Sequence, residues 1–204
     1  MKRQLTISFL ALLFLFDISF GQTIPKDSLT LATKKLLTQP FDLHSFKNKK
    51  GQSNSGGPGE TKFFFKPGKG VYWGFFLFRP MVGYYGNDTS TKIHTENGLH
   101  IITFQPADKY QNKYLNPNET LIQVTARYNE FDLPELAFVG HNTKAIRKKL
   151  GPCSLQKKDC LIYFYGNNIL TLHTTKGTVD WLKYTRLKFA VTIGNIPDEL
   201  LTDY

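Results

Sequence analysis

The 204 residues of the chain suffice for one domain or for two small lobes that share a core. Hydrophobic residues make up 41% and charged residues 21%, a balance that excludes an intrinsically disordered chain. The formal net charge of +10 favours anionic partners, although basic groups spread along the chain are also what a solubilising surface requires.

Residues 1–21 have the organisation of a secretory signal peptide. Lys2 and Arg3 precede an apolar run over residues 5–16, and small residues stand just before Gln22. An apolar run of about twelve residues is too short to span a bilayer as a helix. We therefore expect cleavage between Gly21 and Gln22, with a retained anchor as the alternative, and a secreted or periplasmic protein without a transmembrane segment in its mature part.

Residues 22–60 are expected to form an N-terminal helical arm followed by a flexible linker. Asp27 precedes LTLATKKLL and Pro40 follows it, which is typical of a short capped helix. This helix either packs on the core or remains a mobile arm. Residues 41–60 are rich in Gly, Ser, Asn and Lys, so they bury too little apolar surface to offset the entropy of ordering them.

Residues 61–204 are expected to form a single α+β domain built on an antiparallel sheet, with one or two short helices. Two aromatic-rich runs flank a turn at 67–70 and predict a pair of strands. The second run, 71–78, is apolar on both faces, which predicts a central strand covered on two sides. Asn97-Gly98 is the dipeptide preferred by type I′ turns and predicts a hairpin. Residues 120–128 predict a further strand.

The best-patterned stretch is Ala137 to Arg186, which predicts a short helix followed by a three-stranded meander. Asn142 or Thr143 can cap this helix, and Gly151-Pro152 is a stop signal. The predicted buried side of the helix consists of Ala145, Ile146 and Leu150. At about two turns, such a helix requires packing against the meander to persist.

Two-residue turns at Asn167-Asn168 and Lys176-Gly177 set the predicted register of the meander. One face, expected to pack against the helix, carries Leu161, Tyr163, Tyr165, Leu170, Leu172, Val179 and Trp181. The opposite face carries Ile162, Phe164, Ile169, Thr171, His173, Thr175, Asp180, Leu182 and Tyr184. We expect Trp181 to contribute the largest buried area on the helix-covered face.

The string GHNTKAIRKKLGP, followed by a meander ending in KGTVDWLKY, resembles the small helix-plus-sheet modules of the BamE-like (SmpA/OmlA) outer-membrane assembly lipoproteins. Those modules carry a glycine, a short helix and an LG-P turn ahead of three antiparallel strands. The chain departs from them in having no lipid-anchoring cysteine after the signal peptide. The resemblance implies a protein-interaction role in a bacterial envelope, and it brings no catalytic residues.

Cys153 and Cys160 are the only cysteines, and export would place them where disulfides persist. We therefore predict a disulfide that closes the loop CSLQKKDC, worth about 2 to 3 kcal/mol in the chain-entropy model. The alternative is a nucleophilic or metal-binding thiol. The spacing is not C-x-x-C, and no histidine stands nearby in the sequence.

His173 and Asp180 stand opposite each other in the predicted register and are the candidate catalytic pair. A carboxylate can orient an imidazole as a base, as nucleophilic catalysis requires. No hydroxyl nucleophile is marked beside them, and the chain contains no G-x-S-x-G motif. The ordinary interpretation is a cross-strand pair that supports sheet register.

His94 and His100 flank the predicted hairpin and are the most tempting metal ligands. A two-residue turn at Asn97-Gly98 places the imidazoles on opposite faces, and only a three-residue loop would let them share a metal. We therefore expect no metal site and no cofactor.

The densest basic cluster is expected on the outward face of the predicted helix. It consists of Lys144, Arg147, Lys148 and Lys149. Such a cluster can contact phosphates or an acidic polymer, and a solvated helix face is the alternative. No nucleic-acid motif accompanies it and export argues against nucleic acid, so we expect an envelope protein or an anionic polymer as partner.

The sequence therefore favours a non-enzymatic binding or interaction protein of the cell envelope or extracellular space. The alternative is a secreted hydrolase. Its site would have to be assembled from separate loops, because the carboxylates are scattered along the sequence and form no recognisable pair. N-x-T sequons at Asn87 and Asn118 matter only where the organism glycosylates exported proteins.

Overall fold

The computed structural model describes residues 29–50, 62–83, 92–107, 118–128 and 133–202. The expected signal peptide with its cleavage site between Gly21 and Gln22 and the sequon at Asn87 lie outside these ranges. Within the described ranges, no helix is long and apolar enough to cross a bilayer.

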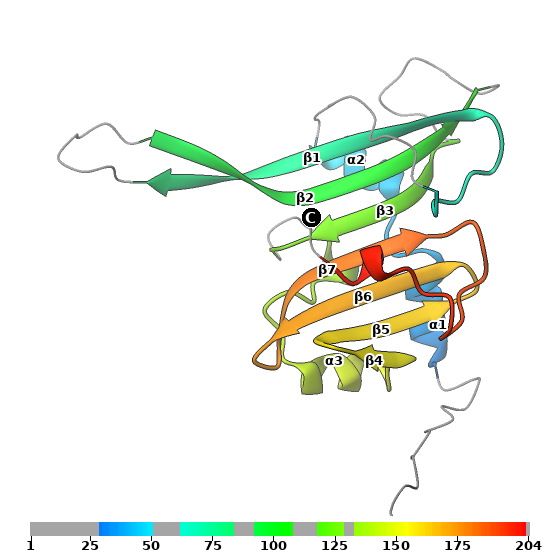
Figure 1. Cartoon of the computed structure of the whole chain (residues 1–204). Coiled ribbons are helices and arrows are strands. Elements are labelled where there is room, and N and C mark those ends of the chain that lie inside the picture. The colour runs from blue at the N-terminus through cyan, green and yellow to red at the C-terminus, as the bar shows by residue number, and fades with distance from the viewer. Residues whose placement is uncertain (1–28, 51–61, 84–91, 108–117, 129–132, 203–204) are drawn as a thin grey trace, which may run out of the picture.

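The strands form one antiparallel sheet of seven strands in the order β1-β2-β3-β7-β6-β5-β4 (Figure 1). Their bounds are β1 Gly70–Gly83, β2 Lys92–Pro106, β3 Thr120–Ala126, β4 Leu155–Lys157, β5 Cys160–Tyr165, β6 Asn168–Thr175 and β7 Thr178–Arg186. Each meander, β1 to β3 and β4 to β7, runs through neighbouring strands, and the pairing of β3 with β7 joins the two. The fold is α+β with the sheet dominant.

Helices cover one face of the sheet and the C-terminal segment covers the other. The helices are α1 Leu31–Thr38, α2 Leu43–Lys50 and α3 Thr143–Leu150. In Figure 1, α1 and α2 lie behind the sheet, whereas the red C-terminal segment crosses in front of β7. We call the two sides the helical face and the tail face.

The core of the helical face is a row of side chains that crosses five strands. The row consists of Ile101, Val124, Tyr184, Leu170 and Tyr163, each the cross-strand partner of the next. Leu37 of α1, Phe46 of α2 and Ile146 of α3 pack in the same cluster. Burying one such side chain stabilises the fold by about 1.5 to 3 kcal/mol. This packing stabilises the helices, which are too short to persist alone.

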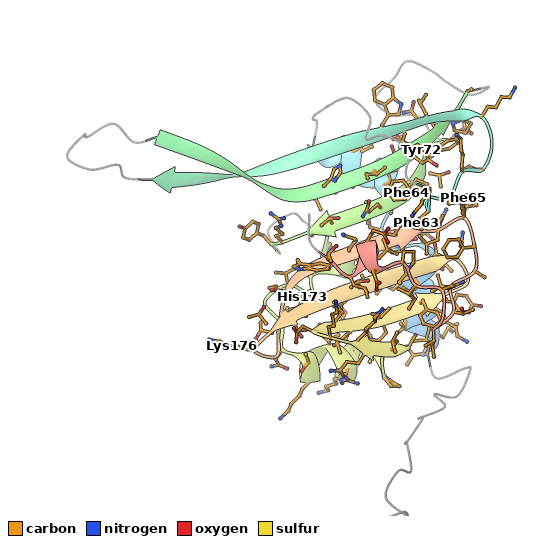
Figure 2. All side chains as sticks on the ribbon, viewed as in Figure 1. Phe63, Phe64, Phe65, Tyr72, His173 and Lys176 are labelled. Carbon is orange, nitrogen blue, oxygen red and sulfur yellow. The ribbon has the colours of Figure 1, made fainter. Side chains whose placement is uncertain are left out.

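The tail face has two apolar clusters. Leu187, Val191 and Leu201 of the C-terminal segment pack with Cys160 and Ile162 of β5. Beside them, the segment before β1 packs on the sheet. Phe64 lies against Tyr72 with ring centroids 5.7 Å apart, and Tyr72 lies against Phe104 at 5.2 Å (Figure 2).

The predicted N-terminal helix is present as α1. α1 packs on the core instead of forming a mobile arm, and Thr30 caps it by accepting from the Thr33 N–H. The expected linker at 41–60 contains α2. Phe41 and Phe46 are buried in an edge-to-face pair at 5.6 Å, so local composition understated the apolar surface of this segment.

The aromatic run before residue 67 does not form a hairpin with β1. Phe64 instead makes an isolated bridge with Leu187, just after β7. β1 is an edge strand of the sheet, not the predicted central strand, and Val71 is exposed. Tyr72 and the partly buried Trp73 still lie on opposite faces, as the alternation required.

Asn97-Gly98 is a β-bulge within β2 and not a hairpin turn. The partners of β1 shift at this point, with Leu77 opposite Leu99 and Phe78 opposite Asn97. Gly98 is therefore the additional residue, and its carbonyl accepts from the Arg127 N–H.

Helix α3 forms where it was predicted. The Asn142 side chain accepts from the Ala145 N–H at 2.9 Å, and Gly151 ends the helix with φ at +82°. Ile146 and Leu150 are buried, but Ala145 is exposed. Backbone hydrogen bonds between the start of α3 and the start of β7, such as Thr143 N–H to Gly177 O, fix the helix against the meander.

The first meander turn is displaced by one residue from its predicted place. Tyr165 pairs with Asn168, so the turn is at residues 166–167. This displacement changes each pairing by two residues and leaves every side chain of β5 and β6 on its predicted face. The second turn lies at Lys176-Gly177 as predicted, and both residues have positive φ.

Val179 lies on its predicted face, but a bulge at Asp180 reverses the predicted faces of β7 from Trp181 onward. Thr174 pairs with Val179, but His173 pairs with Trp181, so Asp180 is the additional residue. Trp181 therefore lies on the tail face with His173, not on the helix-covered face. Leu182 and Tyr184 take the helical face in its place.

The predicted disulfide is absent, and Cys153 and Cys160 are both free and buried. Cys153 belongs to the core of the helical face, whereas Cys160 belongs to that of the tail face. A disulfide requires the two Cβ atoms to approach each other. These side chains point to opposite sides of the sheet, which separates the two thiols.

A buried ion pair fixes α2 to the sheet. Lys47 Nζ donates to Glu119 Oε2 at 2.6 Å, and the two side chains are only 4% and 2% exposed. Thr103 of β2 donates its hydroxyl to the other oxygen of Glu119. No sequence pattern indicated this contact between residues 72 positions apart.

We predict that titration of the denatured protein without reductant detects both thiols, whereas the native protein reacts slowly because both side chains are buried. The measurement is absorbance after addition of an aromatic disulfide reagent. Absence of thiols in the denatured, unreduced sample would restore the disulfide and contradict the structure.

We predict that Lys47→Met lowers the free energy of unfolding by about 3 to 5 kcal/mol, because it leaves the Glu119 carboxylate buried without its cation. Urea denaturation measures the change. The double variant Lys47→Met/Glu119→Leu should recover most of the loss, since neither charge then remains buried. Equal stability of the Lys47→Met variant and the parent protein would show that the pair is solvated.

Candidate functional site

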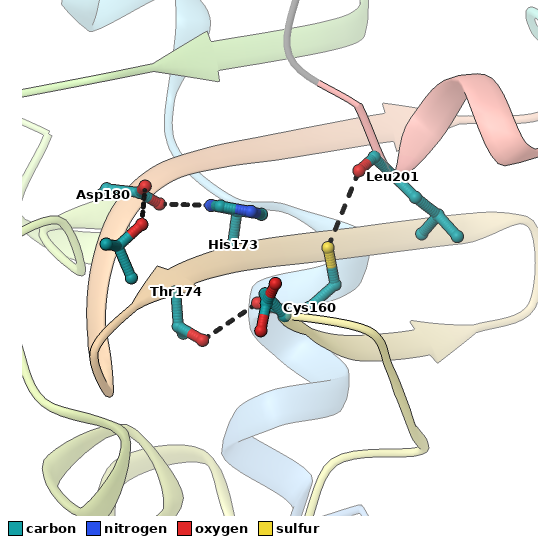
Figure 3. Close-up of polar contacts among 7 residues, drawn as sticks. Cys160, His173, Thr174, Asp180 and Leu201 are labelled. Atoms are coloured by element: carbon teal, nitrogen blue, oxygen red, sulfur yellow. Dashed lines mark hydrogen bonds and ion pairs between the residues drawn. The ribbon is translucent and has the colours of Figure 1, made fainter.

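The side chains of His173 and Asp180 meet, although they are not directly opposite in the register. The imidazole Nδ1 lies 2.6 Å from Asp180 Oδ1, and the Thr175 hydroxyl donates to Oδ2 at 2.6 Å (Figure 3). The bulge at Asp180 turns the carboxylate back toward both partners. The carboxylate therefore joins the end of β6 to the start of β7 across the turn.

The surroundings of His173 favour a structural role for this pair. The imidazole stacks on the Trp181 indole at 5.0 Å with an interplanar angle of 3°. Cys160 is its cross-strand partner in β5. The Cys160 thiol donates to the Leu201 carbonyl at 3.7 Å (Figure 3), and burial, reinforced by Asp159, raises its pKa. The thiol is thus held neutral, which is its less nucleophilic form.

Asp180 stays ionised at neutral pH. Its partial burial raises the carboxyl pKa, but the hydrogen bonds from Thr175 and His173 outweigh that effect and leave the pKa below its usual value. Thr174 fastens the same corner to the preceding turn, since its N–H and hydroxyl both donate to the Asp159 carbonyl. The cluster can hold the β6–β7 corner rigid.

A belt of buried polar residues crosses the middle of the tail face, and the sequence did not reveal it. Lys183, which is 2% exposed, donates through Nζ to the carbonyls of Glu199 and Thr202 at 3.4 and 2.6 Å. The hydroxyls of Thr125, Thr171 and Thr185 are buried and have no hydrogen-bond partner within the described part of the chain. Lys183 thereby attaches the C-terminal segment to the sheet.

The described histidines belong to no cluster of metal-binding side chains. In the parts of the chain that the structure describes, no group of three His, Cys, Asp or Glu side chains could hold a metal ion. His94 and His100 belong to one strand, β2, because the expected hairpin does not exist. The side chain of His94 lies outside the description, whereas that of His100 is largely buried.

The helices are uniformly basic. Together α1, α2 and α3 contain nine lysines and arginines and no aspartate or glutamate. The predicted binding residues Lys144, Arg147, Lys148 and Lys149 are all exposed on α3. Two of them are ordered: the Arg147 guanidinium donates to Gln156 Oε1 at 2.9 Å, and Lys149 Nζ lies 4.6 Å from the centroid of the Phe138 ring. Lys47 of α2 is buried and does not belong to an exposed cluster.

Helices α1 and α3 are neighbours on the molecule. The Thr33 hydroxyl of α1 donates to the Leu150 carbonyl at the end of α3, at 2.7 Å. Lys34 and Lys35 directly follow Thr33, so they stand next to the point where α1 meets the end of α3. We call the six residues Lys34, Lys35, Lys144, Arg147, Lys148 and Lys149 the basic surface.

We predict that the free energy of unfolding falls as pH drops from about 6.5 toward 4. Burial lowers the pKa of His100 to about 4, so the unfolded chain takes up the proton first. The expected loss is about 1 to 2 kcal/mol, below the full linkage value because the imidazole keeps part of its contact with solvent. Urea denaturation at several pH values measures it.

The variant His100→Gln is the control, because no proton binds at this position in either its folded or its unfolded state. Its stability should vary less over the same pH window than that of the parent protein. An identical slope in both proteins would contradict the assignment to His100.

Comparison with known proteins gives no further assignment for this arrangement. No family model matches the chain, and neither a curated protein nor a solved structure matches it.

Proposed function

We propose that the protein is a non-enzymatic binding protein, exported to the cell envelope or the extracellular space, which holds an anionic partner against α1 and α3. The observation that carries this proposal is the complete absence of acidic residues from α1 and α3, which contain six basic ones. A scattered solubilising surface would mix the two signs.

The geometry of the basic surface supports the proposal. On α3, Lys144, Arg147 and Lys148 follow a spacing of three and four residues, which aligns side chains along one side of a helix. The opposite side of α3 is fixed by buried Ile146 and Leu150. Charges presented in this way from a packed helix keep their spacing and attract an extended anion better than mobile ones.

Export supports an anionic envelope component as the partner. Residues 1–21 have the features of a signal peptide. Cleavage after Gly21 would leave a mature protein that begins at Gln22. The resemblance of residues 140–184 to BamE-like modules points in the same direction, toward an interaction role in a bacterial envelope.

The contacts of His173 favour this function over hydrolysis. The second oxygen of Asp180 is occupied by Thr175, and Trp181 covers one face of the imidazole. Both contacts fit a residue that fixes the register of the sheet.

We predict that neutralising α3 weakens binding to immobilised heparin by roughly tenfold or more, since each basic residue near an anionic surface is worth about 1 kcal/mol. The test variant is Lys144→Gln/Arg147→Gln/Lys148→Gln/Lys149→Gln. The control variant, with the same loss of charge outside the helices, is Lys62→Gln/Lys69→Gln/Lys176→Gln/Lys188→Gln, all at exposed positions. The salt concentration of elution is measured.

The control variant should elute close to the parent protein. Equal weakening of the two variants would mean that only net charge matters, and the proposed surface would be wrong. Thermal unfolding of both variants verifies that each is folded.

A further inference from the structure

We propose that the anionic partner is the surface of a lipid bilayer with anionic head groups, and that Leu31 and Tyr165 enter its interfacial region. This inference rests on the proposed function and names the partner of the same surface. It is carried by two exposed apolar side chains that lie among the basic ones.

Leu31 is the more exposed of the two. It is the first residue of α1 and is 85% exposed. It therefore belongs to neither of the hydrophobic cores that cover the two faces of the sheet. Lys34 and Lys35 follow it by three and four residues, so they lie beside Leu31 one helical turn further along. α1 therefore presents a leucine next to two ammonium groups.

Tyr165 provides the second apolar contact. It is the last residue of β5, is 44% exposed, and lies 5.4 Å from Lys34 Nζ, measured to the ring centroid. Tyrosine is enriched at membrane interfaces because its ring is apolar and its hydroxyl remains hydrated. Leu31 and Tyr165 are thus both neighbours of Lys34.

Helix α3 supplies most of the charge for the same surface. The hydrogen bond from Thr33 to Leu150 places the start of α1 at the end of α3. Lysines and arginines around an apolar patch are typical of proteins that bind in the plane of an anionic bilayer.

The apolar side chains favour a bilayer over a soluble polyanion. An anionic polymer gains nothing from contact with an exposed leucine, whereas burial of that side chain in the acyl boundary is favourable. Among the described residues, the large hydrophobic side chains that are clearly exposed are Leu31, Val71, Tyr165 and Ile193. Leu31 and Tyr165 lie at the basic surface, so Val71 and Ile193 provide a matched comparison.

Sedimentation of the exported protein with vesicles tests the inference. The vesicles contain phosphatidylcholine and phosphatidylglycerol in equal parts, or phosphatidylcholine alone. The test variant is Leu31→Ser/Tyr165→Ser, and the control variant is Val71→Ser/Ile193→Ser. We expect the parent protein to bind the anionic vesicles, the test variant to bind them roughly tenfold more weakly, and the control variant to bind like the parent.

Heparin elution of the same proteins separates the two proposals. Unchanged heparin binding by the test variant, together with weakened vesicle binding, supports the bilayer. Heparin binding without vesicle binding by the parent protein overturns the bilayer inference and leaves an anionic polymer as partner. Equal vesicle binding by the test variant and the parent also overturns it. Binding to neither material overturns the proposed function itself.

Discussion

The pairing of β3 with β7 is the constraint on which the rest of the structure depends. It joins two meanders, far apart in the chain, through partners such as Val124 and Tyr184. The resulting sheet is wide and carries apolar clusters on both faces, so each face needs a cover. The short helices α1, α2 and α3 cover one face and the segment after β7 covers the other. Neither cover has enough surface to fold without the sheet beneath it.

Buried lysines attach both covers. Lys47 joins α2 to the sheet through Glu119, and Lys183 holds the C-terminal segment through two backbone carbonyls. A buried ammonium is tolerated only when its hydrogens are bonded to acceptors, so each lysine selects one position of its cover. These polar contacts therefore fix the position of each cover on the sheet more specifically than apolar packing alone would.

The helices serve two purposes because their sides differ. Their inner sides contribute apolar residues such as Leu37 and Ile146 to the core, whereas their outer sides are basic. The sheet thus holds basic helices that are more than a hundred residues apart in the chain. Leu31 and Tyr165 give that surface an apolar component, which distinguishes contact with a bilayer from contact with a polymer.

The sequence by itself determined the local features: the cap and stop of α3, the turn at Lys176-Gly177, and the exposed cluster on α3. These depend on residues within a few positions of one another. Only the tertiary structure decided the rest. The bulge at Gly98 stands where a hairpin turn was predicted. The bulge at Asp180 moved Trp181 to the other face, because one extra residue reverses the alternation of all later side chains in the strand. Strand order and long-range packing decide the edge position of β1, the separation of Cys153 from Cys160, and the contact between the start of α1 and the end of α3. No local pattern encodes these features.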